Sequence, residues 1–363
     1  MCQRTLILVS FATLSMPSEQ RLYAQSASRP VSSPYVTEAL STHYLAVAES
    51  AAVAPGERAV WQRRLDTARD TVENVLAWYA NNGRGDEALR LLTPLGRFWA
   101  GPFLVSAFER ALELPGTSPA IRARALNTAA AAAFRVKNQE RTQKWANESI
   151  AIWRSLGNPA QTGRAYQRLV QLALRDGNHP LLRALADTGD LLCGQAHDED
   201  CQAYFLNMRG ESARVLKQYD AATVFYDQAG IIYARLSPVV QLGLLHNVGF
   251  TLLGGGHNIE GCRRFREGLG HALANGNRPY QPGMLAGLAS CDAVGGNAAS
   301  AAKLFGVSDA QLDRLGIVSD PADAVEYERY RTIARNQLGA VAFDSLVKAG
   351  RILPADSVFA ARK

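Results

Sequence analysis

Residue types that perform catalysis or bind metals are present in the sequence, but few of them stand together. His197, Asp198, Glu199 and Asp200 form one run of four potential metal ligands. Consecutive residues of a short loop cannot all point at one ion, so the run indicates a solvated loop and we expect no metal. Cys193 lies near His197, but no third group is present to orient the imidazole. No His-Glu-x-x-His, Cys-x-x-Cys or Gly-x-Ser-x-Gly motif occurs. We therefore expect no catalytic residues and no enzyme activity.

Phosphate and nucleic-acid chemistry is also poorly supported. The glycine-rich turn at residues 254–257 ends in His257 and has no lysine to reach a phosphate, and no Gly-x-x-x-x-Gly-Lys-Ser/Thr motif occurs. The chain has 39 Lys and Arg residues against 33 Asp and Glu, which gives a net charge of +6. These basic residues are scattered among acidic ones and form no run. The pattern predicts no cofactor and no direct contact with nucleic acid.

Polar side chains suited to binding recur at equivalent positions of successive segments. Asn127, Gln167, Asn207 and Asn247 form a column of amides at one register. The candidate partner-binding residues are Arg124, Asn127, Arg164, Gln167, Gln171, Tyr204, Asn207, Arg214 and His246. Arginine together with asparagine along a groove holds the backbone or a carboxylate of an extended peptide by charge-assisted hydrogen bonds. The alternative interpretation is a solvated face whose amides only bond neighbouring helices.

The elements that carry these residues are predicted to be helices. After a Ser/Pro-rich linker at residues 27–36, nearly every segment has apolar residues spaced by three and four. Turn signals interrupt this pattern at residues 156–158, 176–178, 275–277 and 295–297. Short helices joined by short loops pack as antiparallel pairs, so the chain is predicted to be all-α.

The helical segments repeat with a period of forty residues, with starts near residues 120, 160, 200, 240 and 280. The third unit is the clearest, because its small and aromatic residues stand at the spacing of the tetratricopeptide pattern. These residues are Gly210, Tyr219, Ala222, Tyr226 and Ala229. A single unit of this kind cannot bury its apolar face, so the units must stack. The predicted fold is a right-handed α-solenoid of tetratricopeptide-like helix hairpins, whose first helices line a concave wall.

Four regions follow from this pattern. Residues 1–35 form a signal-like or truncated N-terminal segment and linker, and residues 36–118 form the N-terminal helices of the solenoid. Residues 119–318 hold the five repeats, and residues 319–363 are expected to form a helical cap, because an end unit must present a polar outer face.

The end of the chain carries a more specific pattern. Ala302, Leu304, Phe305 and Gly306 are followed by a second group, which consists of Glu326, Glu328, Arg329, Ala334, Leu338, Gly339, Phe343 and Gly350. Over about residues 40–355 the sequence resembles the C-terminal helical-repeat region of bacterial STAND-type regulatory ATPases, the kind linked to LuxR-type or SARP-type transcription activators. The ATPase and DNA-binding modules of that family have no counterpart in this sequence. The resemblance implies a cytoplasmic sensor or scaffold arm in bacterial signalling or transcriptional regulation, with a protein or peptide partner on the concave face.

Two other functions remain open. One is a regulatory subunit that works with DNA through a partner in a transcriptional activator complex. The other is an exported peptide-binding adaptor, because residues 4–16 are apolar and Ala24, Ser26 and Ala27 suit a signal peptidase. The apolar stretch is too short to cross a bilayer, so no membrane span is expected.

The cysteines bear on this choice. If Cys2 were removed with a signal peptide, four cysteines would remain: Cys193, Cys201, Cys262 and Cys291. They allow two local disulfides, Cys193 with Cys201 and Cys262 with Cys291. The alternative is that they are free thiols, which pack as small apolar residues in helix interiors.

Overall fold

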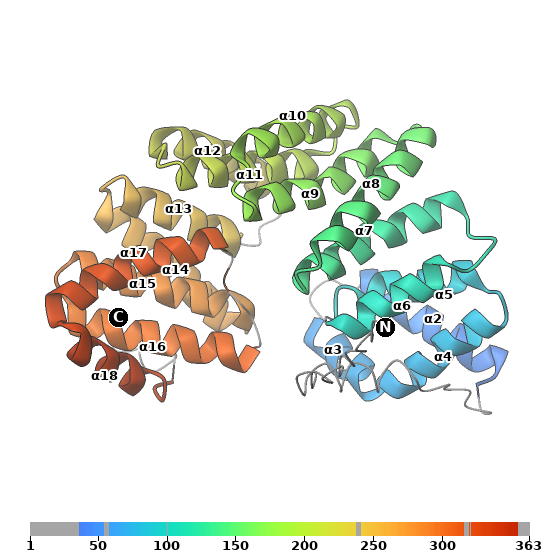
Figure 1. The fold of residues 1–363 in the computed structure, drawn as a ribbon, viewed down its shortest axis with the longest axis horizontal. Coiled ribbons are helices and arrows are strands. Elements are labelled where there is room, and N and C mark those ends of the chain that lie inside the picture. Colours follow the sequence, from blue (N-terminus) through green and yellow to red (C-terminus); the bar gives the residue numbers. More distant parts are fainter. Residues whose placement is uncertain are drawn as a thin grey trace, which may run out of the picture.

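The computed structural model describes residues 36–354 apart from 54–57, 100, 237–240, 316–318 and 320. Throughout these residues the chain is helical and contains no strand, so the all-α prediction is confirmed. The helices form an arch in which the N-terminal and C-terminal units lie on opposite limbs (Figure 1). Among the described residues, no helix combines the length and apolar character that crossing a membrane requires. The predicted N-terminal segment at 1–35 and the last residues of the predicted cap, 355–363, lie outside the described residues.

Five helix hairpins make up most of the arch. Their first helices are α7 (Pro119–Arg135), α9 (Pro159–Arg175), α11 (Glu199–Val215), α13 (Leu242–Gly254) and α15 (Gln281–Val294). Their second helices are α8 (Gln139–Ser155), α10 (His179–Gln195), α12 (Tyr219–Leu236), α14 (Asn258–Ala274) and α16 (Ala298–Leu315), and a 3-10 turn, η1 (Arg278–Tyr280), precedes α15. Each helix packs against the next one along the chain. In Figure 1, α7, α9, α11 and α13 lie on the inner side of the arch and α8, α10 and α12 on its outer side. The predicted right-handed solenoid of tetratricopeptide-like hairpins is therefore the fold of this chain.

The helix junctions repeat because one turn chemistry recurs. Gly157 and Gly177 adopt positive φ angles of 64° and 67°, a conformation that glycine reaches without a Cβ clash. The next residue, Asn158 or Asn178, caps the following helix by accepting a hydrogen bond from the third residue after it. Each turn is therefore short and sharp, and the two helices that it joins lie antiparallel.

Small residues beneath aromatic rings set the spacing between helices. A Cβ added at Gly210 would lie 2.6 Å from the ring of Tyr226, and one added at Gly287 would lie 2.2 Å from the ring of Phe265. Both rings are fully buried. Gly210 and Tyr226 belong to the tetratricopeptide spacing of the third unit, and they bring its two helices, α11 and α12, into close contact.

The N-terminal helices extend the stack and differ from expectation at one point. They are α2 (Glu38–Val53), α3 (Arg58–Thr67), α4 (Arg69–Asn81), α5 (Gly85–Leu95) and α6 (Pro102–Leu112). The sequence pattern predicts one helix through Trp61 and Trp78, whereas the structure has two, separated at Ala68, where ψ is 7°. Residues on both sides of the break contact Trp99. Its indole nitrogen donates to Asp66 in α3, and the guanidinium of Arg69 in α4 lies 5.1 Å from its ring.

The C-terminal region is not confined to the end of the stack. Helix α18 (Ala340–Gly350) packs against α16, as a cap would, whereas α17 (Pro321–Leu338) packs on α15 and α16 and reaches back along the inner helices. The ring of Tyr327 lies 5.5 Å from that of Phe250 in α13, and Asp323 forms an ion pair with Arg214 in α11. One wall of the inner surface is therefore built by α17.

Candidate ligand-binding cavity

A cavity of about 400 Å³ lies between α9, α11, α13, α15 and α17. Its polar lining consists of Gln171, Asn207, Glu211, Gln241, His246, Asn247, Ser319 and Asp323, and its aromatic lining of Phe134, Tyr233, Tyr280 and Tyr327. Three of the predicted partner-binding residues, Gln171, Asn207 and His246, are brought together here. Burial raises the pKa of Tyr233 to about 12, so this ring is an uncharged wall at neutral pH.

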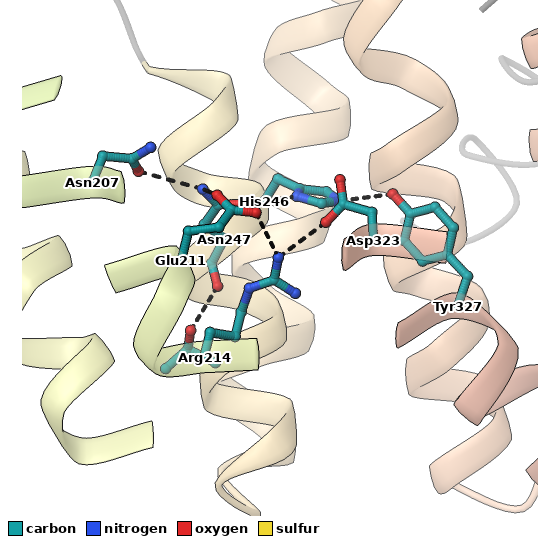
Figure 2. Close-up of polar contacts among 8 residues, drawn as sticks. Asn207, Glu211, Arg214, His246, Asn247, Asp323 and Tyr327 are labelled. Atoms are coloured by element: carbon teal, nitrogen blue, oxygen red, sulfur yellow. Dashed lines mark hydrogen bonds and ion pairs between the residues drawn. The ribbon is translucent and has the colours of Figure 1, made fainter. Parts of the chain in front are cut away.

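Behind the cavity lies a buried ion cluster (Figure 2). Nη2 of Arg214 lies 2.8 Å from Oε1 of Glu211 and 3.0 Å from Oδ1 of Asp323, and the Arg214 side chain is 1% exposed. Burial alone would lower the pKa of Arg214, but the carboxylates of Glu211 and Asp323 offset this and hold the pKa well above its usual value. A buried guanidinium is tolerated only when it is paired in this way. The guanidinium of Arg214 is therefore paired with carboxylates of this chain.

Two members of the amide column take part in the same network. Nδ2 of Asn247 donates to Oδ1 of Asn207 over 3.3 Å and to Oε2 of Glu211 over 2.9 Å. His246 bridges to α17, with its Nδ1 3.2 Å from Oδ1 of Asn247 and its Nε2 2.9 Å from the hydroxyl of Tyr327. These contacts connect α11, α13 and α17 through the cavity wall (Figure 2).

A third carboxylate, Glu326, stands next to this cluster. Its Oε1 lies 3.6 Å from Nη1 of Arg329. Burial raises the pKa of Glu326 above the usual range of a carboxyl group, although Arg214 and Arg329 act in the opposite direction. Glu211 and Asp323 contact the Arg214 guanidinium directly, whereas Glu326 acts on it only through space and is itself paired with Arg329.

The other predicted binding residues on the inner helices do not line the cavity. Arg164 pairs with Asp198 over 2.7 Å and with Asp200 over 3.3 Å. The backbone oxygen of Gln167 accepts a 3.4 Å hydrogen bond from the hydroxyl of Tyr204, whose pKa is raised above its usual range by burial. Arg124 is exposed and Asn127 is half-buried. The run at residues 197–200 therefore contributes ion pairs between α9 and α11 through Asp198 and Asp200. Asp198 also caps α11.

The metal and nucleophile candidates have structural roles. Among the described residues, no group of three His, Cys, Asp or Glu side chains is arranged to hold a metal ion. Cys193 is joined to Cys201 by a disulfide between α10 and α11, and Cys262 is joined to Cys291 between α14 and α15. The two Cα atoms are 5.8 Å apart in each pair, which is the usual separation for a disulfide. Cys193 is thus tied to Cys201 and not paired with His197.

Sequence reasoning missed Glu211, Asp323 and Tyr327 as members of the site. One signal was available for Glu211, because it stands in a run of small residues, Gly210 to Ala213, with Arg214 three positions later. A charged pair within a run of small residues indicates burial with mutual pairing. Asp323 and Tyr327 gave no such signal, because their partners Arg214 in α11 and His246 in α13 are 109 and 81 residues away from them in the sequence.

Comparisons with known proteins give the class but no family. No protein-family model matches the chain, and no curated protein matches it. A solved structure of a Rap protein complexed with Competence and Sporulation Factor matches with a TM-score of 0.54 and 11% sequence identity, covering 88% of this chain and 92% of that chain. At this identity the match establishes the fold alone. The fold and the cavity together define a tetratricopeptide-like helical-repeat protein.

Proposed function

We propose that this protein is a non-catalytic repeat protein that binds a protein or peptide partner in the cavity between α9, α11, α13, α15 and α17. The observation that carries the proposal is the cavity itself: about 400 Å³ on the inner side of the arch, with amide side chains beside aromatic rings. Amides hydrogen-bond both the N–H and the C=O groups of a peptide backbone, and aromatic walls bury its side chains. The likeness in fold to a Rap protein that is itself complexed with a factor supports the same function.

The biological setting that we propose is bacterial signalling or transcriptional regulation. The resemblance to the repeat region of STAND-type regulators supports a sensor or scaffold arm in the cytoplasm, which passes on the presence of its ligand. The position of α17 suits this role, since Asp323 and Tyr327 belong both to the cavity wall and to the C-terminal helices. A bound ligand would thus contact the repeats and the C-terminal region at once. Regulation of a DNA-binding partner would be one output of this arrangement.

A second candidate is an exported peptide-binding adaptor. The observation that favours it is the presence of both disulfides, because disulfides persist in oxidising compartments and are rare in the cytoplasm. The binding surface would be the same in either compartment. Intact-mass analysis of the mature protein separates the two settings, because export would remove Met1 to about Ala24.

The binding proposal is tested by filling the cavity. Gly243 lines the cavity, and a Cβ added there would meet only the ring of Tyr280 at 3.8 Å. Gly243→Leu therefore occupies the cavity without displacing backbone, and Ala234→Leu, at an exposed position of α12, is the control. Peptides selected on the intact chain from a random heptapeptide phage library are titrated as fluorescein conjugates by anisotropy. We expect Gly243→Leu to lose at least tenfold in affinity and Ala234→Leu to match the wild type. Equal affinity for all three proteins would overturn the proposal.

A further inference from the structure

The lining of the cavity is unbalanced in charge. Glu211 and Asp323 both contribute carboxylates to it, whereas none of the described residues that line it is a lysine or an arginine. The nearest guanidinium, Arg214, is buried behind the wall and paired with both acids. Glu326, which does not line the cavity, is paired with a different guanidinium, that of Arg329, over 3.6 Å. A ligand group at this end of the cavity therefore meets a negative potential.

The aromatic lining points independently to the same ligand chemistry. Phe134, Tyr233, Tyr280 and Tyr327 line the cavity. The face of an aromatic ring carries partial negative charge and attracts ammonium and guanidinium groups, most strongly when these groups are desolvated. Rings without acids would suit any apolar side chain, and acids without rings would suit a hydrated ion. Rings and carboxylates in one cavity favour an organic cation.

An acidic ligand group is disfavoured by the same contacts. The sequence pattern suggested that arginines of the inner face hold a carboxylate, but Arg164 is paired with Asp198 and Arg214 with Glu211. Arg168 does not line the cavity, and its Nη1 donates to Oε1 of Gln171 over 2.6 Å. A carboxylate in the cavity would lie beside Glu211 and Asp323 without a partner of opposite charge. Such like-charge juxtaposition costs binding energy and reduces the affinity for acidic partners.

We propose that the cavity selects a cationic side chain, an arginine or lysine within a peptide segment, held between the carboxylates of Glu211 and Asp323 and the rings of Tyr280 and Tyr327. This inference rests on the proposed function and adds the chemical class of the ligand. Because α17 supplies Asp323 and Tyr327, the bound cation also strengthens the attachment of α17 to α11 and α13.

The test uses three fluorescein-labelled pentapeptide pools that are identical except for a central Arg, Gln or Glu, and that are blocked at both ends. The intact chain is titrated with each pool by anisotropy, alongside three variants. Gly243→Leu fills the cavity, and Asp323→Asn removes the more exposed carboxylate, whose side chain is 20% exposed. Asp309→Asn is the matched control, because it also removes the partner of an arginine, Arg331, between two helices but lies outside the cavity.

We expect the Arg pool to bind the wild type at least tenfold more tightly than the Glu pool, with the Gln pool between them. Asp323→Asn should reduce this ratio to about threefold or less, and Asp309→Asn should preserve it. Circular dichroism checks that each variant is folded. Hydrogen exchange in α17 should slow when the wild type binds the Arg pool, and this readout does not depend on any variant.

The failure of this inference differs from the failure of the proposed function. If Gly243→Leu abolishes the binding of every pool and the wild type binds the Arg and Glu pools equally, or prefers Glu, the cavity binds peptides but the cationic preference is wrong. If Gly243→Leu leaves the binding of every pool unchanged, the cavity is not the binding site and both proposals fail. A ratio that Asp309→Asn reduces as strongly as Asp323→Asn also overturns the assignment to the cavity.

Discussion

The packing of α18 on α16 depends on two glycines that let the helix backbones touch. A Cβ added at Gly306 would lie 2.1 Å from the carbonyl oxygen of Val347, and one added at Gly350 would lie 2.0 Å from that of Lys303. Both obstructing atoms belong to backbone, so no side chain can rotate to relieve the contact. The helices would have to separate by about 1 Å to restore the ordinary carbon–oxygen distance of about 3.3 Å. Gly306→Ala therefore tests whether this close approach holds the C-terminal region.

The expected magnitude follows from two opposing effects. Overpacking a well-packed contact costs about 1–3 kcal/mol, and a clash with backbone belongs at the upper end of that range. Replacing glycine by alanine within a helix stabilises the folded state by about 0.5–1 kcal/mol. We expect Gly306→Ala to lose about 2 kcal/mol of local stability in α18. In contrast, Gly230→Ala meets only Cδ2 of Leu244 at 3.4 Å and should gain about 0.5–1 kcal/mol in α12.

Native-state hydrogen exchange is the appropriate assay, because a stack of repeats opens locally and a single melting temperature would average over its units. The amides of α18 and of the facing turns of α16 should exchange faster in Gly306→Ala, whereas the amides of α7 to α10 should not change. The reasoning is refuted if α18 is protected equally in Gly306→Ala and the wild type. It is also refuted if the loss of protection spreads evenly along the chain.

Three further predictions follow from the buried charges and the disulfides. Because the folded-state pKa of Glu326 is raised, its contribution to stability is present below the ordinary carboxyl pKa and is lost as the pH rises through the folded pKa. Glu326→Gln should therefore melt above the wild type at pH 8 but not at pH 4, and a lower melting temperature at pH 8 would contradict this. Arg214→Ala should destabilise the chain by about 3–5 kcal/mol in urea unfolding, since it strands buried carboxylates; exposed Arg124→Ala should change the stability by less than about 0.5 kcal/mol. The disulfide Cys262–Cys291 closes a loop of 29 residues, so Cys262→Ser/Cys291→Ser should cost about 3–4 kcal/mol under non-reducing conditions, and no change would mean that these thiols are free in the purified protein.

The fold was predictable because its determinants are local and repeat. The helix caps Asn158 and Asn178, each preceded by a glycine, stand twenty residues apart, and the pairing of Gly210 with Tyr226 recurs one unit later as Gly249 with Phe265. Each unit therefore supports the interpretation of the next. The break at Ala68 was not predictable from helical spacing. It depends on contacts of Asp66 and Arg69 with Trp99, about thirty residues away, and helical periodicity contains no information about such contacts.

The candidate site was only partly predictable, because residues of the same type at equivalent repeat positions have different neighbours. Asn207 and Asn247 occupy equivalent positions and are hydrogen-bonded to each other, whereas Asn127, at the same position in the first repeat, has a buried Oδ1 that meets no hydrogen-bond partner among the described residues. The difference comes from Glu211, which receives the Nδ2 hydrogen bond of Asn247, and from α17, which reaches the later repeats through Asp323.

The arginines of the inner face also show that sequence periodicity does not reveal the neighbours of a side chain. Arg164 and Arg214 were both predicted to face a partner, and the structure pairs both with acids of this chain, Arg164 with Asp198 and Arg214 with Glu211 and Asp323. The spacing of the sequence predicts that a guanidinium lies on the inner face, but it does not show whether a carboxylate from another helix of the same chain forms an ion pair with it. Once those acids are in place, Arg164 and Arg214 are neutralised, and the described residues that line the cavity include two carboxylates but no lysine or arginine. The same periodic sequence that suggested a groove for the backbone or a carboxylate of a peptide thus folds into a cavity for which we propose a cationic ligand.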